Sequence, residues 1–165
     1  ALTITVEYDA DVRHDLTYFI AQVAKVHVDR VTGQVRALRL VTAHDVGTLI
    51  HPLAHQGQID GGVITGFGLG VTEEFVTDGG QVVNGNMGDY KLPTMADIPA
   101  LETVLIQTGG GAGPYEAKAI GELANNATAA AIANAVADAV GCRVFELPIT
   151  ADRVYKALRD TADKG

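Results

Sequence analysis

The stretch that decides the fold runs from Gln58 to Phe75 and reads QIDGGVITGFGLGVTEEF. Its apolar residues recur at every fourth position, a period typical of a helix, at Ile59, Val63, Phe67 and Val71. A row of glycines, called the glycine row below, repeats beside them at Gly62, Gly66 and Gly70. Each glycine in a helix costs about 1 kcal/mol relative to alanine. We therefore expect close contact on the glycine row, from another chain segment, a flat ligand or ordinary helix packing.

The residues before this helix predict a β-hairpin. The segments 21–29 and 34–42 are rich in β-branched residues, and the turn Arg30-Val31-Thr32 between them ends in Gly33, which suits a positive φ. Residues 2–7 alternate between apolar and polar side chains, which predicts one further strand.

The residues after the glycine-rich helix predict a mixture of strands and helices. The expected elements are an irregular connection at 77–99, a strand at 101–108, a helix at 122–140 closed by Gly141, a short strand at 143–147, and a helix at 151–161 capped by Thr150. The fold class is therefore α+β, with strands and a hairpin followed by Gly/Ala-rich helices.

Composition limits the classes of partner. With 165 residues, 47% of them apolar and 19% charged, the chain is expected to fold around one core. Twelve basic and twenty acidic residues give a net charge of −8 without a basic cluster, which argues against nucleic acid and anionic membranes as partners. No uncharged run reaches the ~18 apolar residues of a spanning helix. The single cysteine, Cys142, suits a small core residue in a reducing, cytoplasmic compartment.

Two pairs of side chains could bind a metal or transfer protons, but we expect both pairs to have structural roles only. His51 and His55 lie four residues apart and could share a metal on a helix. Pro52 pushes His51 out of helical geometry, and a third ligand is not evident, so we predict no metal site. Glu73 and Glu74 point in different directions on a helix and are expected to be a solvated helix end.

The glycine run 109–113 leads into Lys118-Ala119-Ile120-Gly121-Glu122. A phosphate-binding loop would need Ser or Thr directly after its lysine, whereas Ala119 follows Lys118 here. From the residues alone, Glu122 is expected to be a first-turn carboxylate that the dipole of the following helix stabilises.

Four motifs in order make the sequence resemble a known family. They are Asp45-Val46-Gly47 with His51-Pro52, then Gly57-Gln58-Ile59-Asp60-Gly61-Gly62, Asp89-Tyr90-Lys91-Leu92-Pro93, and Gly113-Pro114-Tyr115-Glu116-Ala117-Lys118-Ala119-Ile120-Gly121-Glu122. Together they resemble the C-terminal part of the molybdenum-binding subunit of the xanthine dehydrogenase and aldehyde oxidase family. The resemblance extends from about Tyr18 to Leu158.

The resemblance implies that residues 1–165 are a single C-terminal molybdopterin-binding lobe of a larger catalytic unit. It implies that Glu122 is the catalytic base and that Gln58 contacts the pterin. The backbone of the residues before the base would line the cofactor, at Lys118, Ala119, Ile120 and Gly121. The cofactor would also occupy the glycine row, and the rest of its site would lie on the remaining part of the molybdenum-binding subunit.

The reaction implied is hydroxylation of an N-heterocycle or an aldehyde, with water as the source of oxygen. The alternative is a non-catalytic assembly or scaffold lobe of the same complex. A chain with one cysteine cannot hold an iron–sulfur cluster, so iron–sulfur and FAD centres are expected on partner subunits. His51, Glu116 and Leu123 depart from the family's usual residues, and they leave the substrate open. The molybdopterin could be the plain form or the cytosine dinucleotide.

Overall fold

The structure, a computed structural model, describes residues 3–7 and 17–162. Its elements are β1 (Ile20–Val28), β2 (Val35–Asp45), α1 (Pro52–Val71), β3 (Thr77–Asp78), β4 (Gln81–Val82), α2 (Met87–Tyr90), β5 (Ala100–Ile106), the 3-10 turns η1 (Pro114–Glu116) and η2 (Leu123–Asn125), α3 (Thr128–Val140) and α4 (Ala151–Ala162). A three-stranded sheet has the order β1-β2-β5, with β1 antiparallel and β5 parallel to β2. This mixture of strands and helices confirms the α+β class.

The predicted hairpin is confirmed by β1 and β2. Asp29 closes its turn, because one carboxylate oxygen accepts a hydrogen bond from the Val31 N–H at 2.8 Å. Gly33 has a φ of 77°, and a Cβ there would lie 2.1 Å from the carbonyl oxygen of Ala151. Only glycine therefore satisfies both the turn and its contact with α4.

The period-four pattern is confirmed as helix α1, which begins earlier and ends earlier than the pattern suggested. His51 is the N-cap, in an extended conformation, and its ring Nδ1 accepts a hydrogen bond from the Ala54 N–H at 3.1 Å. Pro52 occupies the first helical position, where its missing N–H is not needed. The expectation that Pro52 keeps His51 out of helical geometry is thus confirmed.

The glycine row is filled by helix packing. A Cβ on Gly62 would lie 2.7 Å from the Ala124 side chain, and one on Gly66 would lie 2.7 Å from the Asn125 carbonyl oxygen. Further along, a Cβ on Gly70 would lie 3.1 Å from Ala129. The glycines therefore allow η2 and α3 to approach α1, and the expectation that the cofactor occupies this row is wrong at Gly66 and Gly70, where chain atoms take the space.

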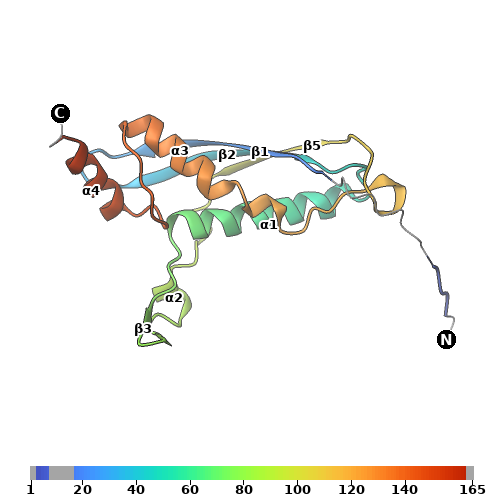
Figure 1. The fold of residues 1–165 in the computed structure, drawn as a ribbon, viewed down its shortest axis with the longest axis horizontal. Coiled ribbons are helices and arrows are strands. Elements are labelled where there is room, and N and C mark those ends of the chain that lie inside the picture. The colour runs from blue at the N-terminus through green and yellow to red at the C-terminus, as the bar shows by residue number, and fades with distance from the viewer. Residues whose placement is uncertain (1–2, 8–16, 163–165) are drawn as a thin grey trace.

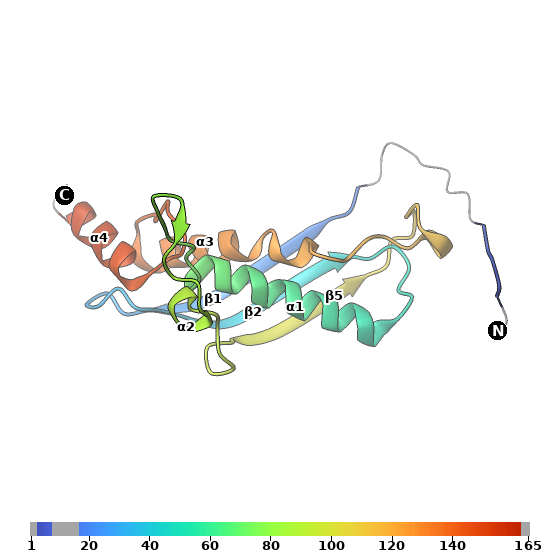
Figure 2. The same cartoon turned by 90° about the horizontal axis from the view of Figure 1, so that it is seen from below.

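The helices α1 and α3 lie side by side over one face of the sheet (Figures 1 and 2). The core lies between these layers and consists of buried aliphatic side chains and one phenylalanine, among them Leu40, Ile59, Val63, Phe67, Ile132, Val136 and Val154. Within the described part of the chain, no helix is long and apolar enough to cross a membrane.

Residues 73–97 form an arm that stands away from this body (Figure 1). The irregular connection expected here contains a two-residue hairpin, β3 with β4, and the single helical turn α2. Because the arm projects from the layers, its side chains contribute little to the core.

Three expected elements differ in the structure. The helix expected from Glu122 begins at Thr128, because η2 and residues 126–127 precede it. Residues 143–147 are not a strand, since no neighbouring strand pairs with them in the described chain. Residues 3–7 also form no strand, and Leu2 lies outside the described residues.

The C-terminal helix and the cysteine follow expectation. The α4 helix is capped by Thr150, whose hydroxyl accepts a hydrogen bond from the Arg153 N–H at 3.3 Å. Cys142 is partly buried against the core, which suits a small packing residue.

Candidate functional site

A hollow of about 270 Å³ lies where the first half of α1 meets the start of η2. Its lining brings together Gln58 and Glu122, two of the residues predicted to form the site, although 63 residues separate them along the chain. The other lining residues are small or polar: Gly57, Gly61, Gly62, Thr65, Gly121 and Asn125.

Gln58 joins the two walls of this hollow. It lies on the exposed side of α1, and its Nε2 donates a hydrogen bond to the carbonyl oxygen of Gly121 at 3.0 Å. Among the described residues, none donates to its side-chain oxygen. The Gln58 amide thus holds the residue before Glu122 and keeps an acceptor for another group.

Glu122 is exposed at the N-terminal end of η2, and its backbone carbonyl accepts a hydrogen bond from the Asn125 N–H at 3.2 Å. No group in the described part of the chain donates a hydrogen bond to its carboxylate. Because α3 begins only at Thr128, Glu122 is not in the first turn of that helix. The interpretation as a first-turn carboxylate is therefore wrong, and the fold assigns this side chain no structural role.

The backbone around the hollow is bare enough for a flat, hydrogen-bonding cofactor to approach it. A Cβ built on Gly57, Gly61 or Gly121 would meet nothing within 4 Å, in contrast to the filled glycine row. These three glycines leave space that larger side chains would occupy. The donor and acceptor groups of Gln58 and the bare backbone fit a pterin, whose ring edge carries both kinds of group.

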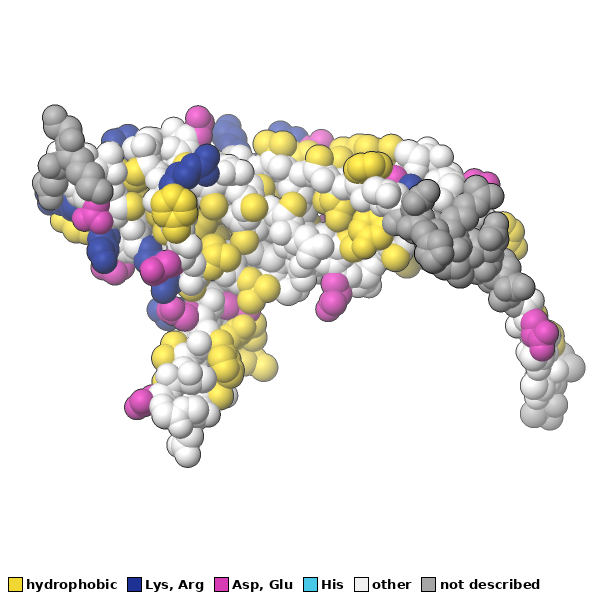
Figure 3. Space-filling model, viewed as in Figure 1, with side chains coloured by type: hydrophobic (Ala, Val, Ile, Leu, Met, Phe, Trp, Pro, Cys, Tyr) yellow, Lys and Arg dark blue, Asp and Glu magenta, His cyan; other side chains and the backbone are white. Residues whose placement is uncertain are grey.

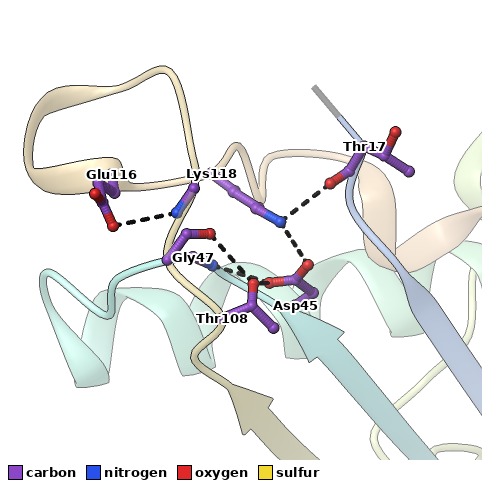
Figure 4. A network of polar contacts seen from close by, with 8 residues as sticks. Thr17, Asp45, Gly47, Thr108, Glu116 and Lys118 are labelled. Atoms are coloured by element: carbon purple, nitrogen blue, oxygen red, sulfur yellow. Dashed lines mark hydrogen bonds and ion pairs between the residues drawn. The ribbon is translucent and has the colours of Figure 1, made fainter. Parts of the chain in front are cut away.

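Lys118 lies at the other end of the motif and is anchored in a buried network (Figure 4). Its Nζ lies 2.6 Å from a carboxylate oxygen of Asp45 and 3.0 Å from the carbonyl oxygen of Thr17. The side chains of Asp45 and Lys118 are only 5% and 12% exposed. The second Asp45 oxygen accepts hydrogen bonds from the Thr108 hydroxyl at 2.5 Å and the Gly47 N–H at 3.1 Å.

This network changes the acidity of Asp45. Burial alone would raise the pKa of the carboxyl, but hydrogen bonds from Lys118, Thr108 and Gly47 act in the opposite direction, and the charge of Lys118 adds to them. The pKa of Asp45 is therefore held below its ordinary value. The backbone adds a further tie, since the Lys118 N–H donates to the Val46 carbonyl oxygen at 3.1 Å.

The residues between the two ends do not share one site. Lys118 and Ala119 line a second hollow of about 390 Å³ with Tyr18 and the glycine run 111–113. Gly121 lies in the hollow of Gln58 and Glu122, and Ile120 lines neither hollow.

The remaining candidates have structural partners. Besides the capping bond of His51, the His55 ring Nδ1 lies 2.9 Å from the His51 carbonyl oxygen. Among the described residues, no cluster of three or more His, Cys, Asp and Glu side chains could hold a metal ion. Glu73 and Glu74 follow the end of α1 at Val71, so the expectation that they lie on that helix is wrong, and the exposed Glu74 forms an ion pair with Arg153 at 2.8 Å.

Sequence reasoning gave no role to Asp45, although the residue belongs to a quoted motif. Its partner Lys118 lies 73 residues further along the chain, and no local pattern links them. The usable signal was an aspartate at the end of an expected strand, two residues before a glycine.

Comparison with a family of molybdopterin cofactor-binding domains matches residues 2–99, which is 98 of the 165 residues. The chain belongs to this family. The xanthine dehydrogenase molybdenum-binding subunit of Escherichia coli O157:H7 is 38% identical over 131 residues, which cover 78% of this chain and 17% of that protein. The aldehyde oxidoreductase molybdenum-binding subunit of Escherichia coli K12 is 36% identical over 145 residues, covering 86% and 20%.

Solved structures agree with this membership. The aldehyde oxidoreductase of Desulfovibrio gigas superimposes with a TM-score of 0.78 at 32% identity, over 86% of this chain and 15% of that one. The chain thus spans about a fifth or less of the length of these relatives. Their domains therefore share its fold, while most of each relative lies outside the matched region.

Proposed function

We propose that this chain is one wall of the catalytic centre of a molybdenum hydroxylase, in which Glu122 is the general base and Gln58 holds the cofactor. The observation that carries the proposal is the hollow that brings Gln58, Gly121 and Glu122 together beside bare glycine backbone. Glu122 has no structural partner in the described chain, which is what a carboxylate kept for chemistry requires.

The residues of the chain have separate tasks in this proposal. Gln58 fixes the backbone at Gly121 and offers its side-chain oxygen to a cofactor N–H. Glu122, directly after that fixed point, accepts a proton at a carboxylate oxygen from the water-derived nucleophile. Positioned acid–base catalysis contributes typically about 10² to 10⁴ in rate. When bound, the molybdopterin supplies the two-electron acceptor that hydroxylation of a carbon with oxygen from water requires.

The finer assignments follow the family relationship. The substrate is an N-heterocycle or an aldehyde, since the named relatives are a xanthine dehydrogenase subunit and aldehyde oxidoreductases. The remaining part of the molybdenum-binding subunit supplies the opposite wall of the site, and iron–sulfur and FAD subunits take the electrons.

The experiment compares Glu122→Gln with the parent in the assembled enzyme, with molybdenum content and turnover as readouts. Glutamine keeps the shape of glutamate and cannot accept the proton, so we expect unchanged molybdenum and turnover reduced by about 10² or more. The control is Glu146→Gln, because that carboxylate is exposed beside Arg153 and remote from the hollow. A Glu122→Gln enzyme with full molybdenum and more than about a tenth of parental turnover would support the scaffold alternative.

The cofactor contact is tested separately with Gln58→Ala. A buried pterin group left unpaired costs about 1 to 3 kcal/mol, so molybdenum content after dialysis should fall. Gln56→Ala on the same helix is the control, because that amide binds Asp60 at 2.7 Å and Thr103 at 2.9 Å, away from the hollow. Equal molybdenum retention in both variants would remove Gln58 from the cofactor site.

A further inference from the structure

The arm, residues 73–97, exposes large apolar side chains that no other described part of the chain covers. Phe75 is 66% exposed, Met87 is 76% exposed and Met95 is 90% exposed, and Val82 and Val83 are also exposed. Figure 3 shows apolar side chains gathered along one side of the arm below the body. Contiguous exposed apolar surface of this kind marks an interaction site in a soluble protein.

The backbone of the arm is nevertheless held in shape by polar contacts. The side chain of Asn84 accepts a hydrogen bond from the Val76 N–H at 3.0 Å and donates to the Glu74 carbonyl oxygen at 2.5 Å. Asn86 caps α2 by accepting from the Asp89 N–H at 3.0 Å. These bonds preorganise the arm without any apolar core of its own, which lowers the entropic cost of binding.

A groove of about 690 Å³ separates the arm from the body. Its arm side includes Val76, Val83 and Leu92, and its body side includes Val71 and Ile149. A chain segment seated there would contact apolar side chains on both walls. Polar and charged side chains such as Glu74, Asp89 and Lys91 lie between these apolar ones, so a bound segment could also form hydrogen bonds and ion pairs there.

We infer that the arm is the element by which this lobe docks onto the remaining polypeptide of the molybdenum-binding subunit. This inference rests on the proposed function, which makes the lobe part of such a subunit. One observation selects this occupant. The related molybdenum-binding subunits are five to six times longer than the matched region, and the cover lies within that additional length.

The test is thiol labelling of Met87→Cys and Met95→Cys, each made with Cys142→Ser, in the assembled enzyme and in this chain alone. We expect both cysteines to react with a maleimide at least tenfold more slowly in the enzyme. Lys156→Cys, on the exposed side of α4, is the control and should react equally fast in both. Equal labelling of the arm cysteines in enzyme and chain would overturn the inference.

Three further measurements separate other outcomes. In the chain alone, the maleimide could react more slowly with Met95→Cys as the protein concentration rises. That result would mean that a second copy of the chain covers the arm, and it would overturn the assignment to the rest of the subunit. Met95→Asp should lower the yield of assembled enzyme at least tenfold, whereas Lys156→Asp should not, and both chains should melt alike on their own. Labelling in the Glu122→Gln enzyme should match the parent, so a failure of the catalytic proposal is distinguishable from a failure of docking.

Discussion

The two ends of the five-residue motif from Lys118 to Glu122 lie in opposite environments. Lys118 is nearly buried, pairs with Asp45 at 2.6 Å and is tied through its backbone to Val46. Glu122 is exposed and has no described partner for its carboxylate, while Gln58 holds the preceding residue by one hydrogen bond. The Lys118 side chain is thus bound within the fold, whereas the Glu122 carboxylate is accessible to a ligand.

The comparison teaches how a short loop can hold an exposed carboxylate in a fixed place. The Asp45 network fixes Lys118 beside the end of β2, and the Gln58 bond fixes the residue before Glu122, where η2 begins. The intervening residues need no further contacts, because both ends are set by side chains of other elements. The glycines show a similar difference. Atoms of η2 and α3 take the space beside the glycine row, whereas a Cβ built on Gly57, Gly61 or Gly121 would meet nothing within 4 Å.

Breaking the anchored end should give the largest loss of stability. Asp45→Leu leaves Lys118 buried without its counter-charge, and we expect about 3 kcal/mol or more of destabilisation. Lys118→Met should cost less, because Asp45 keeps its bonds from Thr108 and Gly47. Urea unfolding of the two variants measures this difference. Equal losses below about 1 kcal/mol would show that the anchor is dispensable.

Filling the packed glycine row should cost less than breaking the anchor. Gly66→Ala places a Cβ 2.7 Å from the Asn125 carbonyl oxygen and 2.8 Å from the Thr128 side chain. Overpacking of this kind costs about 1–3 kcal/mol, which thermal unfolding would detect. A variant as stable as the parent would mean that α1 and α3 can separate freely.

Filling the open glycines should have the opposite effect on the chain alone. Gly61→Ala meets nothing within 4 Å, and the alanine should stabilise α1 by about 1 kcal/mol. In the assembled enzyme the same methyl group intrudes on the hollow, so molybdenum content should fall. If the variant is more stable and fully loaded, the hollow does not contact the cofactor.

The smallest effect is expected from pH. The folded pKa of Asp45 lies below its unfolded value of about 3.9, so its contribution is complete above that value and is lost as pH falls through the folded pKa. Stability of the parent should therefore decrease more steeply below about pH 4 than that of Asp45→Asn, which does not titrate. Parallel pH profiles from acid unfolding would contradict the lowered pKa.

Local patterns predicted the elements that depend on neighbouring residues. The hairpin turn at Gly33, the period of α1 and the Thr150 cap are set within a few residues. The strands expected at 2–7 and 143–147 have suitable side chains, but a strand also needs a neighbour, which the described chain does not provide. The start of α3 was misplaced because the alanine-rich pattern was extended back over Asn125 and Asn126, which have low helix propensity and lie in or next to η2.

The site was predictable only in part for a similar reason. Gln58 and Glu122 were selected by their motifs, and the fold places both in one hollow. Their roles remain proposals. The Asp45–Lys118 pair joins residues from distant parts of the sequence, so only the folded arrangement of β2 against the loop reveals it. The exposed apolar residues of the arm were not predicted, because the turn residues of this segment indicated only an irregular connection.

The most direct test of the central claim is the rate at which substrate reduces the loaded Glu122→Gln enzyme in a single anaerobic turnover. This rate isolates the step in which the base acts from electron transfer to the partner subunits. We predict unchanged molybdenum content and reduction slower than the parent by about 10² to 10⁴. Reduction of a fully loaded Glu122→Gln enzyme within about tenfold of the parental rate would contradict Glu122 as the base.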